Sequence, residues 1–112
     1  MSGSYPLNAQ SVNQQVTRKS PGNYALGYSN GNTFYVQYVG RADIDLNARL
    51  MQHMEDGYKG FMFSYATSPK AAFEKECHNY HDFGGSSSLN NKIHPDRPAN
   101  SGWKCPVCTI FD

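Results

Sequence analysis

Two stretches near the start of the chain alternate apolar with smaller or polar residues, the first around Tyr24 and the second around Val36. Such alternation is typical of β-strands that bury one face. The pair Asn30-Gly31 separates the two stretches, and both residue types tolerate the positive φ that a tight hairpin turn needs. The pattern therefore predicts a β-hairpin that closes near Gly40.

Apolar residues at helical spacing follow the hairpin and predict a helix with Asp43 as its N-cap and Gly57 at its end. Alternation over residues 61–66 predicts a third strand. A second helix is expected to begin after a Ser68 cap and to stop at or before Gly84. This order of elements indicates an α+β fold in which a three-stranded antiparallel sheet is flanked by helices.

The two ends of the chain lack these periods. Residues 1–20 are rich in Ser, Asn and Gln, which predicts a flexible N-terminal arm ahead of a domain that spans residues 21–85. Residues 86–112 contain three Pro and only scattered apolar residues. Because burial alone cannot offset the conformational entropy that such a segment loses on ordering, this C-terminal extension needs an anchor.

The composition excludes several classes of protein. A chain of 112 residues fits one domain, and 13% aromatic with 17% charged residues is unlike a disordered chain. The longest apolar runs fall far short of the roughly 20 residues that span a bilayer, and the first residues lack a signal-peptide pattern. We therefore expect a soluble, cytoplasmic protein with no membrane partner. The formal net charge of +1 means that binding of nucleic acid depends on a local patch.

One carboxylate falls on the inward face of the second predicted helix. At 100° per residue Glu76 lies in the apolar sector, whereas Glu74 points nearly the opposite way. A buried, unpaired carboxylate is costly, so Glu76 should have a metal ion, a cation or a wet cleft as its partner. The alternative is a structural glutamate that is tied to an Arg or Lys.

Further polar residues could reach the same cleft. Arg49 and His53 are spaced i, i+4 and therefore share a face of the first predicted helix. Tyr24 and Tyr38 stand on the two strands of the hairpin. Taken singly, the helix pair could be a solvated edge and the tyrosines could serve only for packing.

Several short motifs follow one another along the chain. They are Gly22-Asn23-Tyr24, Tyr38-Val39-Gly40, Asp45-Leu46 leading into Arg49-Leu50 and His53, and Ala72 with Glu76 four residues later. Read in this order, they resemble the signature of the GIY-YIG nuclease domain over roughly residues 21–91. Asn23 stands where that family usually has an apolar residue, and the gap between the two tripeptides is somewhat longer than is typical.

The resemblance implies a DNA endonuclease that hydrolyses phosphodiester bonds with a divalent cation. Glu76 would hold a single Mg²⁺, a hard ion suited to carboxylate, water and phosphate oxygens. Arg49 would grip the phosphate with its fork of donors. Tyr24, helped by Tyr38 or His53, would orient or deprotonate the attacking water.

A tyrosine with an ordinary pKa near 10 is a poor base at neutral pH, so a nearby cation is needed. Arg41, directly after Tyr38-Val39-Gly40, is the candidate, and it could also contact the substrate. The alternative function is a catalytically inactive GIY-YIG-like module that binds nucleic acid or protein. The near-zero net charge favours that alternative, because phosphate neutralisation dominates affinity for duplex DNA.

The spacing of Cys and His residues predicts a second site, which would bind a metal ion. Cys77 and His81 are spaced i, i+4 on the second predicted helix, and Cys105 and Cys108 form a Cys-x-x-Cys pair. A Cys₃His set suits structural Zn²⁺, which would tie the C-terminal extension to the helix. His94 competes with His81 for the histidine position. The rival interpretations are a redox-active dithiol at the Cys-x-x-Cys pair and plain reduced cysteines.

Overall fold

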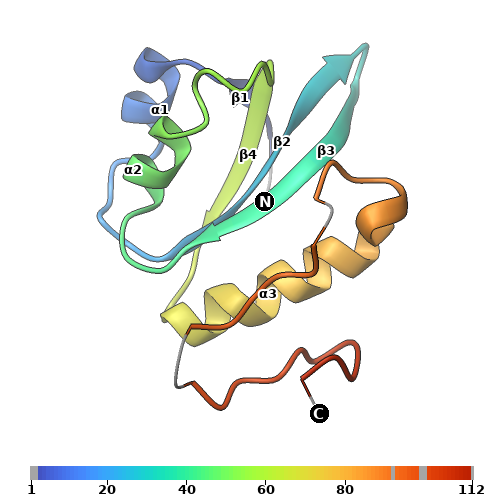
Figure 1. Cartoon of the computed structure of the whole chain (residues 1–112). Helices are drawn as coiled ribbons and strands as arrows, with labels where there is room; N and C mark the ends of the chain where they lie inside the picture. Colours follow the sequence, from blue (N-terminus) through green and yellow to red (C-terminus); the bar gives the residue numbers. More distant parts are fainter. Residues whose placement is uncertain (1–2, 92, 99–100, 112) are drawn as a thin grey trace.

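A computed structural model describes residues 3–91, 93–98 and 101–111 of the chain. The α+β class is confirmed: one antiparallel sheet in the order β1-β4-β2-β3 is covered by helices on both faces (Figure 1). The elements, in chain order, are β1 (Tyr5–Pro6), α1 (Ala9–Gln15), β2 (Gly22–Asn30), β3 (Thr33–Ala42), α2 (Leu46–Met51), β4 (Gly60–Tyr65), α3 (Pro69–Asp82) and the 3₁₀ turn η1 (Gly85–Ser87).

The β2–β3 hairpin forms where the sequence predicts it. Asn30 pairs with Thr33, and Gly31 takes a φ of 65° in the turn between them. The left-handed region costs glycine nothing, which is why the Asn-Gly pair turns the chain here. Strand β4 pairs with the other side of β2, so β2 is central and β3 forms one edge of the sheet.

The prediction of three strands was wrong, and so was that of a flexible N-terminal arm. Among the described residues of the first 20, β1 adds a short fourth strand on β4, and α1 packs its Val12 into the core. Val16, one helical turn further on, is also buried. The polar composition of the segment hid this i, i+4 pair, although Asn8 caps α1 by accepting a hydrogen bond from the Ser11 amide.

Both predicted helices are present. The first begins later than expected and is short, because Asp45 rather than Asp43 caps α2. The second begins at Pro69 after a Ser68 cap and ends at Asp82, as the cap and the following glycines predicted. None of the helices in the described part of the chain has the length and apolar character that crossing a bilayer requires.

The helices lie on opposite faces of the sheet (Figure 1). Leu46 and Leu50 of α2 pack with α1 against the face that carries Tyr24 and Leu26. Tyr80 of α3 packs against the other face, where successive side chains of β2 and β3 alternate to the opposite side. The described tail from residue 101 lies along the outer side of α3.

The segment after α3 covers the edge of β3. The Asn91 amide donates to the Val39 carbonyl at 2.8 Å and accepts from the Val39 N–H at 2.9 Å. The Asn90 N–H donates to the Gln37 carbonyl at 2.6 Å. Both outward-facing backbone groups of Val39 are thereby satisfied without another strand.

Candidate functional site

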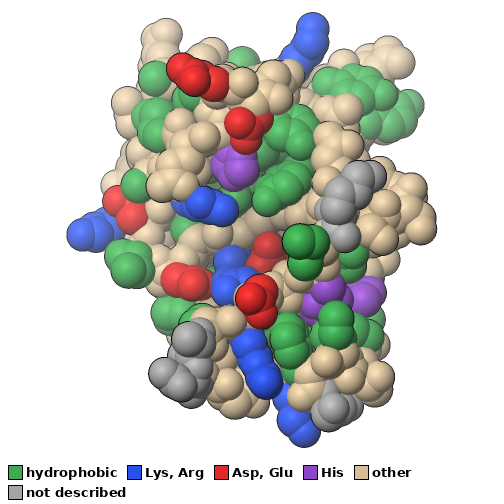
Figure 2. Space-filling model, in the orientation of Figure 1, with side chains coloured by type: hydrophobic (Ala, Val, Ile, Leu, Met, Phe, Trp, Pro, Cys, Tyr) green, Lys and Arg blue, Asp and Glu red, His purple; other side chains and the backbone are tan. Residues whose placement is uncertain are grey.

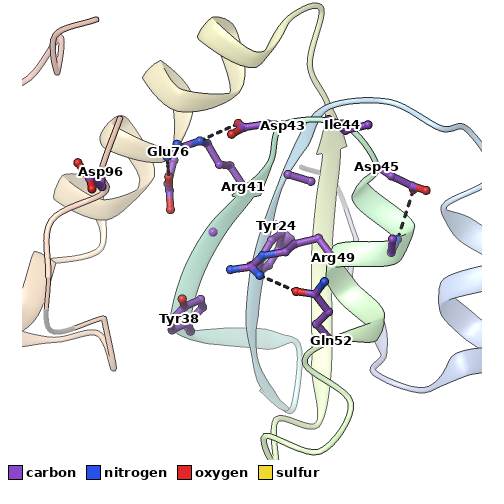
Figure 3. A pocket seen from close by; sticks show the side chains of 13 residues that line it. Tyr24, Tyr38, Arg41, Asp43, Ile44, Asp45, Arg49, Gln52, Glu76 and Asp96 are labelled. Carbon is purple, nitrogen blue, oxygen red and sulfur yellow. Dashed lines mark hydrogen bonds and ion pairs between the residues drawn. The ribbon is translucent and has the colours of Figure 1, made fainter. Parts of the chain in front are cut away.

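A cleft of about 510 Å³ opens between α2, the end of β3 and α3. It curves around the edge of the sheet, because Tyr38 and Arg41 are three residues apart on β3 and point to opposite faces. Acidic and basic side chains gather in the middle of this surface, between α2 and α3 (Figure 2). The predicted site residues that line the cleft are Tyr24, Tyr38, Arg41, Arg49 and Glu76 (Figure 3).

Tyr24 forms the floor of the cleft. Its ring passes so close to Gly40 that a Cβ there would lie 2.3 Å from the ring, so glycine is required at that position. Arg49 lies across the tyrosine in Figure 3, and Tyr24 is fully buried. Burial raises the pKa of Tyr24 well above its usual value, and the positive charge of Arg49 offsets only part of the rise. The cation beside Tyr24 is therefore Arg49 rather than the predicted Arg41.

His53 lies beneath the cleft, within reach of Tyr24. Its Nε2 is 2.7 Å from the Tyr24 hydroxyl, and its Nδ1 is 2.7 Å from Oδ2 of Asp56. A carboxylate can only accept, so Asp56 favours the tautomer with the proton on Nδ1. The Nε2 lone pair then accepts the Tyr24 hydroxyl proton. Asp56 was missed by the sequence prediction, although its i, i+3 spacing from His53 is a readable signal.

Tyr38 stands at the rim on the same side as His53, with ring centroids 5.4 Å apart. The Tyr58 ring also packs near Tyr38, with ring centroids 6.1 Å apart. Partial burial raises the pKa of the Tyr38 hydroxyl above its usual value. Tyr38 therefore presents a neutral phenol to the cleft at neutral pH.

Arg41 is held by two carboxylates. Its Nη1 donates to Oε1 of Glu76 at 2.6 Å and its Nε to Oδ1 of Asp43 at 2.9 Å. The guanidinium also lies over the Phe73 ring, 5.2 Å from its centroid. Although desolvation opposes the charge, the two acidic partners leave the pKa of Arg41 raised. Asp43, predicted as a helix cap, is thus part of the cleft.

Glu76 is buried, as the helical wheel predicted, with 8% of its surface exposed. Burial raises the pKa of its carboxyl, and the hydrogen bond and charge of Arg41 lower it in part. Two of the three partners that the sequence allowed are therefore found: a cation in contact and an open cleft. Asp96, from the C-terminal extension, lines the same cleft and was not predicted (Figure 3).

Four Cys and His ligand atoms lie together on the outer side of α3. The ligand atoms of His81, His94, Cys105 and Cys108 are all within 4.8 Å of one another, and such a His₂Cys₂ cluster could hold a metal ion such as zinc. Both histidines belong to it, whereas the sequence prediction placed them as competitors and gave a position to Cys77. We call this group the His₂Cys₂ cluster.

Cys77 is excluded from the His₂Cys₂ cluster by its surroundings. It is fully buried and packs with Phe73 and Cys105. Burial raises the pKa of Cys77 far above its usual value. For Cys105 burial acts in the same direction, but hydrogen bonds from the backbone of Val107 and Cys108 outweigh it and lower the pKa to about 6. All three cysteines are free thiols.

The fold and these two sites define an α+β protein with a polar cleft at one sheet edge and a His₂Cys₂ cluster behind it. Comparisons with protein-family models, with curated proteins and with solved structures gave no match.

Proposed function

We propose that this chain is a GIY-YIG-like, metal-dependent DNA endonuclease that hydrolyses phosphodiester bonds with one Mg²⁺. The supporting observation is that Tyr24 of β2, Arg49 of α2 and Glu76 of α3 line one open cleft. These three groups come from separate elements, so their convergence is not a consequence of local sequence spacing.

Arg49 is the group that meets the scissile phosphate. It is exposed, its Nη1 donates to Oε1 of Gln52 at 2.6 Å, and its planar fork suits phosphate oxygens. When Arg49 turns from Gln52 toward a bound phosphate, it uncovers the Tyr24 hydroxyl beneath it. Substrate binding and exposure of the catalytic hydroxyl are then one movement.

Tyr24 acts on the attacking water through His53. Because burial raises the pKa of Tyr24, the hydroxyl does not ionise by itself at neutral pH. His53 Nε2 takes the hydroxyl proton, and the phenolate oxygen takes a proton from the water. Asp56 holds the imidazole in the tautomer that makes this transfer possible, and it stabilises the imidazolium that results.

The acidic side chains of the cleft fit a hard divalent cation. Glu76, Asp43 and Asp96 all line the cleft and offer carboxylate oxygens. When bound, Mg²⁺ supplies charge stabilisation to the phosphoryl and leaving oxygens. Arg41 holds Glu76 in the absence of an ion and neutralises part of the local negative charge. Within this proposal the metal of the His₂Cys₂ cluster is a structural Zn²⁺.

The test is cleavage of plasmid, branched and single-stranded DNA in the presence of Mg²⁺. Removal of one electrostatic contact to the transition state costs about 10²- to 10³-fold in rate, and we expect at least this loss for Glu76→Ala. Glu74→Ala is the matched control, because Glu74 lies on the same helix but does not line the cleft. Equal background cleavage by the wild-type chain and Glu76→Ala would refute the proposed activity.

The ion pair between Arg41 and Glu76 favours a second candidate, an inactive module that binds nucleic acid or protein. A carboxylate that is 2.6 Å from a guanidinium and largely buried already has a stable partner. A gel-shift titration discriminates the two: the inactive module binds DNA with a salt-dependent affinity and leaves it intact with or without Mg²⁺. The endonuclease produces cut ends only when Mg²⁺ is present.

A further inference from the structure

The His₂Cys₂ cluster has the ligands and the spacing of a closed tetrahedral metal site. His81 comes from α3, His94 from the segment after it, and Cys105 and Cys108 from the tail. Bonds of 2.0 to 2.3 Å to a tetrahedral Zn²⁺ place ligand atoms about 3.3 to 3.8 Å apart. The observed separations, all within 4.8 Å, need only a small contraction to reach this.

The two histidines present ring nitrogens that are ready to bind an ion. His94 Nδ1 is 2.8 Å from the Pro95 carbonyl, which accepts its proton and leaves Nε2 as the free acceptor, 3.3 Å from the Cys108 sulfur. His81 Nε2 is buried and has no hydrogen-bond partner. An orphaned buried nitrogen is costly, and a metal ion would remove that cost.

The cysteine half lies beside a third cysteine that is not part of the ligand set. Cys77 is fully buried and packs with Cys105 and Phe73 on the outer side of α3. The four ligand atoms that lie within 4.8 Å of one another do not include its sulfur. Cys77 is therefore a neighbour of the cluster rather than a ligand.

We propose that the His₂Cys₂ cluster binds one Zn²⁺, which fastens the C-terminal extension to α3 and thereby holds Asp96 in the wall of the cleft. Zn²⁺ is favoured because two thiolates and two imidazoles are the borderline-soft set that it prefers in four-coordinate structural sites. The part of the proposal that concerns Asp96 rests on the proposed function.

The coupling between the ion and the cleft follows from the covalent chain. Asp96 is two residues from the ligand His94 and lines the cleft that contains Glu76. Arg97, the next residue, donates from Nη1 to the Trp103 carbonyl at 2.8 Å, which joins this segment to the tail near Cys105. Release of the ion frees both His94 and Cys105, and the cleft loses the support of this wall.

The first experiment measures metal content. Elemental analysis of the wild-type chain, purified without chelator, is expected to give one zinc per chain, and Co²⁺ exchange is expected to give the visible absorption of a tetrahedral dithiolate site. His94→Ala and Cys108→Ser are expected to lose the ion. Cys77→Ser is the control and is expected to keep it, as the ligand set requires.

Several outcomes overturn the zinc site. A wild-type chain that takes up no zinc, even when Zn²⁺ is titrated in competition with a chromophoric chelator, refutes it without any variant. Retention of the ion in His94→Ala together with its loss in Cys77→Ser would refute this ligand set. Reversible formation of a disulfide between Cys105 and Cys108 in the folded, metal-free chain, with no uptake of zinc, would support a redox dithiol instead.

The second experiment follows the tail and the cleft together. Trp103 is the single tryptophan of the chain and packs against Phe73 with ring centroids 5.8 Å apart. Removal of zinc from the wild-type chain is expected to shift the Trp103 fluorescence to longer wavelength. It is also expected to lower the Mg²⁺-dependent cleavage rate. Asp96→Asn is expected to lower the rate while its zinc and its fluorescence are unchanged. Unchanged fluorescence after removal of zinc would refute the fastening role.

The two proposals fail separately in these experiments. Zinc in the cluster without any DNA cleavage refutes the endonuclease and leaves the metal site standing. Mg²⁺-dependent cleavage by a chain that takes up no zinc refutes the metal site and leaves the endonuclease standing. Full cleavage by Asp96→Asn and by the metal-free chain would refute only the link between the ion and the cleft.

Discussion

The two sides of helix α3 are stabilised by different means. Its inner side packs on the sheet, where Tyr80 joins the apolar residues Ala25 and Val39, and the α1–α2 layer covers the opposite face of that sheet. Its outer side carries the tail through a small cluster, Phe73 and Cys77 with Cys105, beside the His₂Cys₂ cluster. Apolar burial is ample on the first side and scarce on the second. From this difference we expect the sheet to depend on packing alone and the tail to depend on the ion proposed for the His₂Cys₂ cluster.

The largest expected effect comes from creating a cavity in the core between α2 and the sheet. Leu50→Ala removes a fully buried side chain of α2 and should lower the free energy of unfolding by about 2 to 5 kcal/mol. Zinc content should not change, because the two sides are stabilised separately. Urea denaturation measures the loss. Ile44→Ala is the control, since Ile44 is 70% exposed and should change stability by less than about 0.5 kcal/mol.

The next effect concerns the tail. A ligand present at about a thousand times its Kd stabilises the state that binds it by about 4 kcal/mol. We therefore expect that added Zn²⁺ raises the temperature at which Trp103 fluorescence changes, by more than it raises the transition in far-ultraviolet circular dichroism. Without zinc the fluorescence transition should come first. Coincident transitions in the metal-free chain would show that the two sides unfold as one unit.

A smaller effect is expected where the segment after α3 meets the sheet. Asn91→Ala removes both hydrogen bonds to Val39 and leaves buried backbone groups without partners, at a cost of about 1 to 3 kcal/mol. Asn90→Ala is the matched control, because the Asn90 side chain donates an exposed hydrogen bond to the Tyr58 hydroxyl and does not bond to the Val39 backbone. Thermal melts of the two variants test this, and equal losses would contradict it.

The smallest effect is a pH dependence at the cleft. Burial raises the pKa of Glu76, so the folded state binds its proton more tightly than the unfolded state. The stability that this group contributes is fully present below its unfolded pKa and is lost as pH rises through its higher folded pKa, by about 1.4 kcal/mol for each pKa unit of the shift. Relative to Glu76→Gln, the wild-type chain should therefore lose stability as pH increases through that window. Urea titrations at a series of pH values check the sign.

Much of the sheet and of the helix packed on it could be predicted from the sequence, because the signals for these elements are local. Asn30-Gly31 encodes the hairpin turn, and Ser68 with Pro69 encodes the start of α3. The position of Glu76 followed from helical geometry alone. The α1 segment was missed because its apolar residues are few, and only their contact with α2 makes them a core.

The site was predictable in its side chains but not in their pairing. The positions of Tyr24, Arg49 and Glu76 in one cleft follow from the order of elements once the fold is known. The partner Asp43 depends on turn geometry after β3, which no periodicity encodes, whereas Asp56 could have been found from its i, i+3 spacing from His53. The exchange of Cys77 for His94 as a cluster residue depends on how the tail folds back, a long-range event without a local signal.

The contact of Asn91 with Val39 has a consequence for self-association. An edge strand with free N–H and C=O groups is a template on which a second chain can add a strand, and such additions lead to aggregation. The side-chain amide of Asn91 imitates a neighbouring backbone at the one position where it docks, which blocks continuous pairing along β3. We therefore expect the segment that follows α3 to hinder edge-to-edge strand pairing between two copies of the chain.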